Sequence, residues 1–415
     1  MARVLLLTLV FSPDSVSTAV LMTELAQELQ ALGHELTVLT TTPHYNIEPE
    51  ARARQPLQSR WRSLLYTSQC GEIPVYHVSV PVKGSRVGAR LLDYLRFHII
   101  STLVGLTVIR KYDVILVPSP PLTIGLSAWV LRLFRRAPFI YNVQEIYPDI
   151  AIQLGVLQNK GAIRFFEVVE RFVYRRARQI TVISERFRQA LLAKGVPAGK
   201  LHTIPNFVDT EFIQPGPRDN AFAQAHGLAD KFVVLYAGNI GLTQSLEAML
   251  ASAHQLQDQP EIHFLIVGDG TRRAWLTEQL AHWPQPNVTL LPYQSRSVVA
   301  QIYASSDLCL VPLKRGTAQG TFPSKVYTIM AANRPVLVAA DPESELVDVV
   351  QRANCGWVVP PDDRDSLVDA IRKAYQSGDE CRTKARNGYA YVTRYHTRSG
   401  VAGQYDVLIR QVTHG

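Results

Sequence analysis

Cysteine is scarce in this sequence. Only four cysteines occur among 415 residues, and no two of them form a Cys-x-x-Cys pair or another metal-binding spacing. Disulfide frameworks and zinc sites both need such clusters. The sequence therefore predicts small buried thiols in a reducing compartment, at Cys70, Cys309, Cys355 and Cys381.

Long apolar runs are also missing. The longest, residues 97–109, contains a histidine and is shorter than the roughly 20 residues that a membrane-spanning helix needs. The apolar segment after Met1 resembles a signal peptide only superficially, because no small-residue cleavage site follows and a Ser-Pro-Asp sequence interrupts it. We interpret it as the first buried strand of a parallel sheet. We therefore do not expect an integral membrane protein.

Motifs for nucleic-acid and nucleotide-triphosphate binding are absent. No helix-turn-helix, zinc-finger or RNP-type motif accompanies the basic residues, so nucleic acid is not an expected partner. No Gly-x-x-x-x-Gly-Lys-Ser/Thr sequence occurs either. Neither a metal nor another cofactor is expected.

The net charge of +8 is unevenly distributed. Residues 1–205 carry a net charge of +10, and the rest of the chain carries −2. Much of the positive charge lies on amphipathic stretches near residues 86–111, 132–136 and 171–178. Such stretches are typical of peripheral binding to an anionic membrane, although an ordinary solvated helix face also explains each of them. We expect a cytoplasmic protein bound peripherally to the inner face of the membrane.

Strand and helix patterns alternate along the chain. The first half opens with a strand at 4–10, a helix from about 18 to 32 and a strand at 34–40. This alternation predicts α/β domains with doubly wound parallel sheets. Because 415 residues exceed one ordinary core, we predict two such domains, separated by a Pro/Gly-rich linker at 214–219.

Two further segments are less regular. Residues 47–62 are polar and arginine-rich and show no strong periodicity, which favours a mobile flap. Residues 389–412 are predicted to form one helix after the last elements of the second domain.

Ligands of parallel α/β sheets bind beyond the carboxyl ends of the strands. In the first half, this rule selects loops 11–17 and 41–46 and the polar cluster 144–149, which follows a strand. Carboxylates at strand ends are often functional, although simple solvation of a loop explains them nearly as well. The candidate first-half residues are Ser15, Ser17, His44, Tyr45, Gln144, Glu145 and Asp149.

Four loops of the second half are suited to bind phosphate. They follow predicted strands, and three of them carry glycines or helix-capping residues whose N–H groups suit a pyrophosphate. For any one loop alone, an ordinary capped helix start is a better explanation than a phosphate site. Because several such loops are expected at one sheet edge, we favour an anion-binding site. The loops are residues 238–244, 268–270, 292–294 and 314–324, the last leading into a helix near Lys325.

Several segments carry a resemblance to a known family. They are Gly238-Asn239-Ile240-Gly241-Leu242-Thr243-Gln244, Val267-Gly268-Asp269-Gly270, Ile204-Pro205-Asn206-Phe207-Val208-Asp209 and Pro323-Ser324-Lys325-Val326-Tyr327. Together they resemble glycosyltransferase family 4, and more narrowly the bacterial subgroup with colanic-acid fucosyltransferases and O-antigen fucosamine transferases. The similarity extends over essentially the whole chain.

The resemblance implies the GT-B fold, in which two Rossmann-like domains face each other across a cleft. An acceptor-binding domain is expected at 1–213 and a nucleotide-sugar-binding domain at 214–390. Residues 391–415 are expected to form a helix that crosses back to the first domain.

The resemblance also implies retaining transfer of a hexosyl or N-acetylaminosugar group. The expected donor is a UDP- or GDP-sugar, and the acceptor is a saccharide or an undecaprenyl-linked saccharide of cell-surface polysaccharide synthesis. Lys325 is expected to stabilise the departing diphosphate, and Glu145, Asp149 and His44 to contact acceptor or donor sugar. The implied donor-binding residues are Gly238, Asn239, Gln244, Gly268, Asp269, Gly270, Pro292, Tyr293, Gln294, Gly320, Thr321, Phe322, Pro323, Ser324 and Thr328.

The sequence departs from the family pattern at four of these positions. Asn239 and Gln244 stand where the family usually has Arg and Lys, and Gly320 and Thr328 where it usually has a Glu-x7-Glu pair. These departures leave open one alternative, a nucleotide-sugar-binding scaffold without turnover. A second alternative is a GT-B epimerase, which would use similar phosphate loops. The available replacement cations are Lys325, Lys314 and Arg315.

Overall fold

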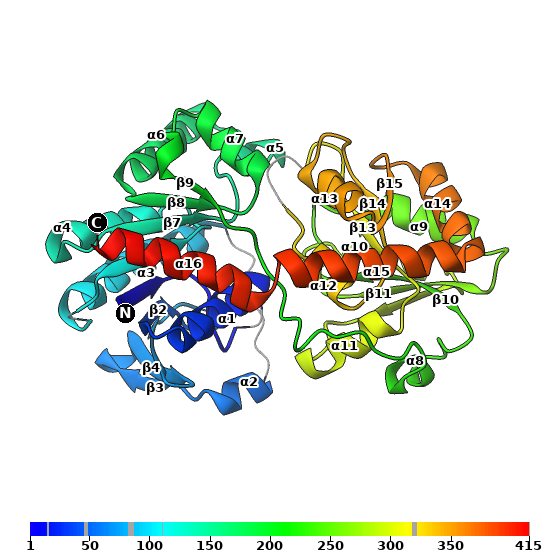
Figure 1. The fold of residues 1–415 in the computed structure, drawn as a ribbon, viewed down its shortest axis with the longest axis horizontal. Helices are drawn as coiled ribbons and strands as arrows, with labels where there is room; N and C mark the ends of the chain where they lie inside the picture. The colour runs from blue at the N-terminus through cyan, green and yellow to red at the C-terminus, as the bar shows by residue number, and fades with distance from the viewer. Residues whose placement is uncertain (15, 45–48, 82–86, 110, 318–321, 415) are drawn as a thin grey trace. The chain divides into compact units, whose positions relative to one another are not determined.

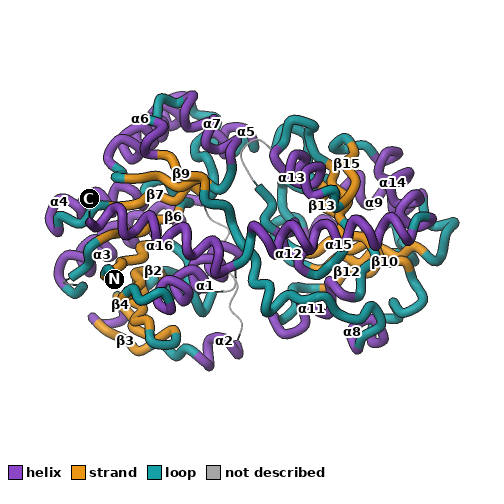
Figure 2. The backbone as a smooth tube through the Cα atoms, viewed as in Figure 1, coloured by secondary structure: helices purple, strands orange, loops and turns teal. Residues whose placement is uncertain are grey.

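The computed structural model describes all residues except 15, 45–48, 82–86, 110, 318–321 and 415. In each of two compact units, strands form a central sheet and helices cover both of its faces (Figures 1 and 2). The first unit comprises Met1–Ile152, Leu157–Asn206 and Arg398–Gly415, and the second comprises Gln153–Val156 and Phe207–Thr397.

The first unit is organised around a nine-stranded sheet in the order β3-β4-β5-β2-β1-β6-β7-β8-β9. From β5 to β9 in this order, all neighbouring strands are parallel. Their nearly continuous apolar sequences follow from burial on both faces. The strands are β1 (Arg3–Leu7), β2 (Glu35–Thr41), β3 (Gln58–Arg60), β4 (Leu65–Cys70), β5 (Ile73–Val78), β6 (Val114–Pro118), β7 (Phe139–Val143), β8 (Gln179–Val182) and β9 (Leu201–Thr203).

One edge of this sheet corrects the sequence interpretation. The segment 47–62, predicted as a flap without regular structure, contains helix α2 (Pro49–Arg54) and strand β3. Strand β3 pairs antiparallel with β4, and β4 pairs antiparallel with β5. All three residues of β3 are exposed, so the strand has no buried face and no apolar alternation that could reveal it.

Helices of the first unit approach each other closely at glycines, which have no side chain to keep them apart. A Cβ atom on Gly105 of α3 would lie 2.8 Å from Leu131 of α4, and one on Gly125 of α4 would lie 2.4 Å from Val173 of α6. These approaches hold α3, α4 and α6 together. The helices of this unit, besides α2, are α1 (Ser17–Ala31), α3 (Val87–Thr107), α4 (Ile124–Arg135), α5 (Asp149–Gln153), α6 (Lys160–Arg176), α7 (Glu185–Ala193) and α16 (Arg398–His414).

The second unit contains a six-stranded, fully parallel sheet in the order β12-β11-β10-β13-β14-β15. Alternate residues of β10 enter different cores: Val233 and Leu235 pack on one face, Val234 and Tyr236 on the other. The strands are β10 (Phe232–Ala237), β11 (Ile262–Val267), β12 (Val288–Leu291), β13 (Leu308–Pro312), β14 (Val336–Ala339) and β15 (Gly356–Val359).

The helices of the second unit cover both faces of its sheet (Figure 1). In the part of the chain that the structure describes, no helix of either unit has the length and apolarity needed to cross a membrane. The helices are α8 (Ala221–Ala225), α9 (Leu246–Gln255), α10 (Arg273–His282), α11 (Arg296–Ala304), α12 (Lys325–Ala331), α13 (Glu345–Ala353), α14 (Arg364–Gln376) and α15 (Gly378–Tyr395).

The single helix predicted at 389–412 is wrong. The structure has two helices there, α15 and α16, which are interrupted at His396 and Thr397. The His396 carbonyl accepts a hydrogen bond from Val208 N–H (3.0 Å), and its ring stacks on Tyr327 (3.9 Å between centroids). These contacts draw the backbone out of the helix, although the sequence around His396 contains no proline.

Strand order determines where ligands can bind. In the second unit, β11 and β13 lie on opposite sides of β10, so the loops after β10 and β13 diverge at a topological switch point. In the first unit, the corresponding switch point lies between β1 and β6. The predicted donor loops belong to the carboxyl edge of the second sheet, and the predicted acceptor loops to that of the first.

Candidate active site

Glycines allow the loops after β10 and β11 to pack directly against each other. A Cβ atom on Gly268 would lie 1.9 Å from the Gly238 carbonyl oxygen, and one on Gly270 would lie 2.4 Å from the Ile240 oxygen. Backbone hydrogen bonds from Gly238 N to Val267 O (2.9 Å) and from Ile240 N to Asp269 O (2.8 Å) join the two loops. No larger residue fits at these glycines without displacing the backbone.

Lys325 lies at the switch point beside these loops. Its Nζ is 4.1 Å from the centroid of the Tyr236 ring, and a Cβ atom on Gly238 would lie 2.9 Å from it. Among the residues that the structure describes, Lys325 has no hydrogen-bond or ion-pair partner. Burial lowers the pKa of its ammonium group to about 7. An ammonium group that lies against an aromatic ring, with no anionic partner among the described residues, is poised to receive an anion.

The two other cations named as replacements are already engaged. Lys314 Nζ lies 3.5 Å from Glu247, which also binds Arg272 at 2.7 Å. Arg315 donates a hydrogen bond to the Pro361 carbonyl (3.5 Å). Lys325 is therefore the better candidate for the phosphate-binding cation.

Gln244 lies inside its own loop. It is buried, accepts a hydrogen bond from Gly241 N–H (3.0 Å) and donates one to the Thr243 hydroxyl (2.7 Å). The amide of Asn239 is exposed and lies between Gly241 and Gly270. Gln244 thus shapes the loop, whereas Asn239 presents its side chain to solvent.

The remaining predicted donor residues lie on neighbouring loops. Ser324 precedes α12 without a side-chain capping hydrogen bond, so its hydroxyl does not act as an ordinary cap. Asp269 accepts a hydrogen bond from Gly270 N–H (2.7 Å). Tyr293 is exposed after β12, where Gln294 donates to the Pro292 carbonyl (2.9 Å). Phe322, Pro323 and Thr328 are partly buried around α12, and Gly320 and Thr321 lie outside the described residues.

His44 lies at the carboxyl edge of the first sheet. It is buried; its backbone N–H donates to Asp14 Oδ2 (3.2 Å), and its Nδ1 lies 3.0 Å from Thr41 Oγ1. The sequence did not identify Asp14 or Thr41 as site residues. Ser17 is exposed at the start of α1, whereas Ser15 and Tyr45 lie outside the described residues.

Glu145 is a partly buried carboxylate after β7. Burial raises its pKa, and no described residue forms an ion pair or hydrogen bond with its side chain. Its neighbour Gln144 is engaged, donating to Asn142 Oδ1 (2.8 Å) and accepting from Asn206 Nδ2 (2.8 Å). Glu145 is thus available to a ligand, and Gln144 supports the same loop.

Asp149 has a structural partner. Lys194 Nζ lies 2.7 Å from Asp149 and 2.9 Å from the buried Glu170. This ion-pair cluster joins α5 and α6 to Lys194, the residue that follows α7. The negative charge of Asp149 is therefore compensated within the fold, which favours Glu145 over Asp149 as the group available for chemistry.

Within the described part of the chain, no group of three or more His, Cys, Asp or Glu residues is arranged to hold a metal ion. One Asp-x-Asp sequence, residues 363–365, lies at the start of α14. There Asp363 caps the helix by accepting a hydrogen bond from Ser366 N–H (3.0 Å). Capping explains this carboxylate.

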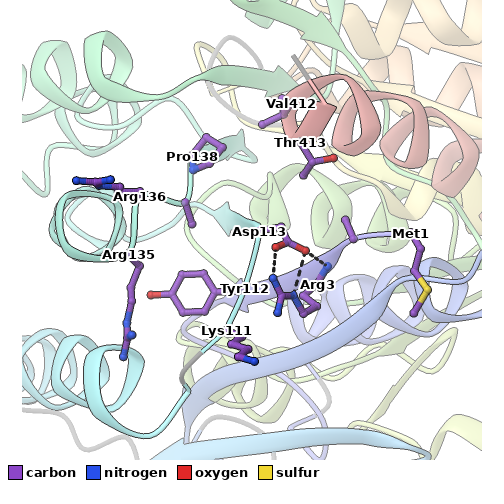
Figure 3. A pocket seen from close by; sticks show the side chains of 12 residues that line it. Met1, Arg3, Lys111, Tyr112, Asp113, Arg135, Arg136, Pro138, Val412 and Thr413 are labelled. Atoms are coloured by element: carbon purple, nitrogen blue, oxygen red, sulfur yellow. Dashed lines mark hydrogen bonds and ion pairs between the residues drawn. The ribbon is translucent and has the colours of Figure 1, made fainter.

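A cavity of about 840 Å³ lies at the opposite edge of the first sheet, where β1, β6 and β7 begin (Figure 3). Lys111, Tyr112 and Pro138 contribute to its lining, and Arg3 forms an ion pair with Asp113 (2.5 Å). No loop after a strand's carboxyl end lines it. Strand topology and residue chemistry, and not cavity size, therefore indicate the candidate site.

Comparison with known proteins identifies the family. A family model for the glycosyl transferase 4-like domain matches residues 18–206, and one for glycosyl transferases group 1 matches residues 231–377. This chain belongs to glycosyltransferase family 4. This chain is 26% identical over 381 residues to Escherichia coli K12 WcaI, which is named as a glycosyl transferase of colanic acid biosynthesis. The match covers 90% of this chain and 92% of WcaI. This chain is 27% identical to Pseudomonas aeruginosa WbjE, named a probable glycosyltransferase, covering 63% of this chain and 66% of WbjE.

Solved structures show the same fold for this family 4 glycosyltransferase. Sucrose-phosphate synthase from Thermosynechococcus elongatus superposes with a TM-score of 0.77 at 18% identity, covering 99% of both chains. Anabaena HepE in complex with UDP-glucose gives 0.72 at 16% identity, covering 99% of this chain and 100% of HepE. The predicted GT-B fold class is confirmed.

Proposed function

We propose that this glycosyltransferase transfers a sugar, with retention of anomeric configuration, from a UDP- or GDP-sugar to a saccharide or a lipid-linked saccharide of cell-surface polysaccharide synthesis. The observation that carries the proposal is the position of Lys325 beside the glycine loops, where its ammonium group has no acidic partner among the described residues. The relative WcaI, named for colanic acid biosynthesis, supports the pathway class, and UDP-glucose bound to HepE supports the donor class.

The chemistry follows from the charge that develops at the leaving group. The bond between the anomeric carbon and the diphosphate breaks, and negative charge grows on the departing phosphate. Lys325 stabilises that charge from its place beside the glycine loops. The acceptor oxygen bonds to the anomeric carbon on the same face, and its proton passes to the departing phosphate oxygen. Glu145 and His44 hydrogen-bond the acceptor or the donor sugar.

Nucleotide binding gives the first test. We expect one of UDP, GDP, ADP and dTDP, at about 100 times its dissociation constant, to raise the melting temperature of the donor-binding unit by roughly 5–10 °C. The sugar derivatives of that nucleotide should then be consumed, and NMR of the product should show retention. A thermal shift without consumption would instead support the scaffold, an alternative favoured by the engagement of Gln244 within its own loop.

We also propose that the first unit binds peripherally to an anionic membrane on its cytoplasmic side. On α3, Leu95, Ile99 and Leu103 are 54%, 59% and 49% exposed and lie at i, i+4 and i+8 on one helix face. Helices α4 and α6 end in basic residues, and one of these, Arg135 of α4, donates a hydrogen bond to the Leu106 carbonyl of α3. An exposed apolar stripe beside arginines fits an anionic lipid surface.

Vesicle sedimentation tests the membrane proposal. We expect binding to vesicles that contain phosphatidylglycerol and little binding to pure phosphatidylcholine, because basic residues supply the attraction. Replacing Leu95, Ile99 and Leu103 together by serine should reduce the bound fraction without lowering the melting temperature, since these side chains are exposed. Equal binding to both vesicle types would contradict the electrostatic part of the proposal.

A further inference from the structure

The turn between β3 and β4 has an unusual backbone. Its residues Trp61, Arg62 and Ser63 have φ values of +44°, +52° and +65°. All three lie in the left-handed region, which is unfavourable for a residue with a Cβ atom. A turn that served only to connect two strands would be more stable with glycine, asparagine or aspartate at these positions. Tryptophan, arginine and serine here indicate that the side chains themselves have a role.

The indole of Trp61 is exposed and has no partner. It is 43% exposed, and no described residue hydrogen-bonds to it, stacks on it or places a cation over it. Trp283, at the end of α10 in the second unit, is 44% exposed, but its ring lies against His254 with 4.1 Å between centroids. Trp283 also has an ordinary φ of −134°. Trp61 therefore differs from an equally exposed tryptophan in both its backbone and its lack of a ring partner.

Strand pairing places this turn at the carboxyl edge of the first sheet. Strand β5 runs parallel to β2, with Val78 opposite Thr41, so both strands end at that edge. Strand β4 runs antiparallel to β5, with Leu65 opposite Val78, and therefore begins there. The Ser79 N–H donates to the Leu64 carbonyl (3.0 Å), which holds the turn against the end of β5. The turn thus lies at the edge where ligands of parallel α/β sheets bind.

The separation of the strands fixes how far the turn lies from the loop that carries His44. That loop follows β2, and β4 is two strands away from β2 in the sheet. The Thr42 N–H donates to the Val78 carbonyl (2.8 Å), so the loop begins beside the end of β5. Two strand spacings amount to roughly 10 Å. A saccharide that spans this distance is longer than one pyranose ring.

An exposed indole suits the face of a sugar ring. Where several C–H bonds of a pyranose point to the same side, that side is apolar, and stacking on an aromatic ring removes both surfaces from water. Tryptophan provides this area with few rotatable bonds to order. Arg60 and Arg62, next to Trp61 in sequence, are also exposed and have no partner among the described residues. Their guanidinium groups are available to hydroxyl, carboxylate or phosphate groups of the same ligand.

We propose that Trp61 binds the acceptor saccharide by stacking on a sugar ring one or two units away from the reacting hydroxyl. The assignment of this saccharide as the acceptor rests on the proposed function. Trp61 contributes affinity and takes no part in breaking or forming the glycosidic bond. Its loss should therefore weaken acceptor binding and leave the chemical step nearly unchanged.

Saccharide binding can be tested without turnover. Fluorine NMR of the full chain labelled with 5-fluorotryptophan reports on five tryptophans, and the Trp61→Phe variant assigns the Trp61 resonance. The ligands are lactose, cellobiose, N,N′-diacetylchitobiose and an acidic hyaluronan tetrasaccharide. We expect at least one of them to shift the Trp61 resonance and to leave that of Trp283 in place. No shift with any of the four would overturn the inference. A shift with phosphatidylglycerol vesicles but with no saccharide would assign the turn to the membrane surface and overturn it as well.

Steady-state nucleotide release tests the same residue during transfer. With the saccharide that shifts the Trp61 resonance as acceptor, Trp61→Ala should raise the acceptor KM about tenfold or more, with kcat and the donor KM nearly unchanged. Trp61→Phe should restore most of the affinity, and Trp283→Ala should match the wild type. Ser63→Gly relaxes the same turn and keeps the indole, so it should raise the melting temperature by roughly 2–4 °C without changing the acceptor KM.

Several outcomes would overturn the inference. They are an unchanged acceptor KM in Trp61→Ala, an equal rise in Trp283→Ala or Ser63→Gly, and an active enzyme that leaves the bound saccharide unmodified. A wild-type protein that consumes no sugar nucleotide would instead contradict the proposed function. In that case the NMR titration still decides whether Trp61 binds a saccharide, so the two failures are distinguishable.

Discussion

Replacing Lys325 by methionine is expected to lower the rate of sugar transfer by about 100- to 1000-fold. The Lys325 ammonium group lies beside the glycine loops and has no hydrogen-bond or ion-pair partner among the described residues, and methionine keeps much of its volume against Tyr236 while removing the charge. The rate loss should appear in kcat because the charge on the phosphate grows most strongly in the transition state. Steady-state nucleotide release measures it.

Two other lysines make the result specific. Lys373 lies on α14 and pairs weakly with Glu380 (3.6 Å), so Lys373→Met should keep the wild-type rate. Lys314→Met should cost much less than Lys325→Met, since Glu247 already compensates the charge of Lys314. Comparable losses in Lys314→Met and Lys325→Met would show that general positive potential, and not one positioned cation, stabilises the leaving group.

Lys325→Met should also stabilise the ligand-free protein. Between the folded pKa of about 7 and the ordinary value of 10.5, the unfolded chain holds a proton that folded Lys325 lacks, so the wild-type free energy of unfolding rises with pH there. Below about pH 7, the folded state carries the full cost of a buried charge. Lys325→Met should therefore raise the melting temperature most at and below pH 7, and progressively less toward pH 10.5.

Much of the donor-side arrangement follows from the sequence alone. Strands with continuous apolar runs identify a parallel sheet, and loops after such strands must meet at its carboxyl edge. That reasoning placed Gly238, Gly268, Gly270 and Lys325 on neighbouring loops, and the structure brings them into contact. It could not show that Gln244 lies inside its loop, because side-chain hydrogen bonds with Gly241 and Thr243 decide its orientation.

Contacts distant in sequence account for what could not be predicted. His77 and Gln55 lie in segments without recognisable motifs, and only the pairing of β4 with β5 places Ser68 between them. The helix break at His396 depends on stacking against Tyr327. The compensation of Asp149 depends on Lys194, the residue that follows α7. In each case the local sequence agrees with two outcomes, and tertiary packing selects one.

Replacing Gly268 by alanine is expected to destabilise the second unit by roughly 2–4 kcal/mol and to abolish the thermal shift caused by nucleotide. The added Cβ would lie 1.9 Å from the Gly238 carbonyl oxygen, a backbone atom that no side-chain rotation can move. Gly268 also has a φ of +156°, which L-residues rarely adopt. The β10 loop must therefore shift, and Gly238 would move relative to Lys325. Denaturant unfolding with and without nucleotide measures both effects.

Gly403→Ala is the matched control, because here the same substitution should stabilise the protein. It lies inside α16, and a Cβ atom there would meet nothing within 4 Å. Gly403→Ala should therefore stabilise the protein by about 0.5–1 kcal/mol, because alanine restricts the unfolded chain and favours the helix. The Gly268→Ala protein is compared with the wild type at a denaturant concentration where both remain folded. If nucleotide still stabilises the variant there, the close approach of the two loops serves folding alone. Loss of the nucleotide-induced shift in a folded Gly268→Ala protein would instead make the contact between Gly238 and Gly268 part of the donor site. That contact positions Gly238, and Lys325 lies beside Gly238.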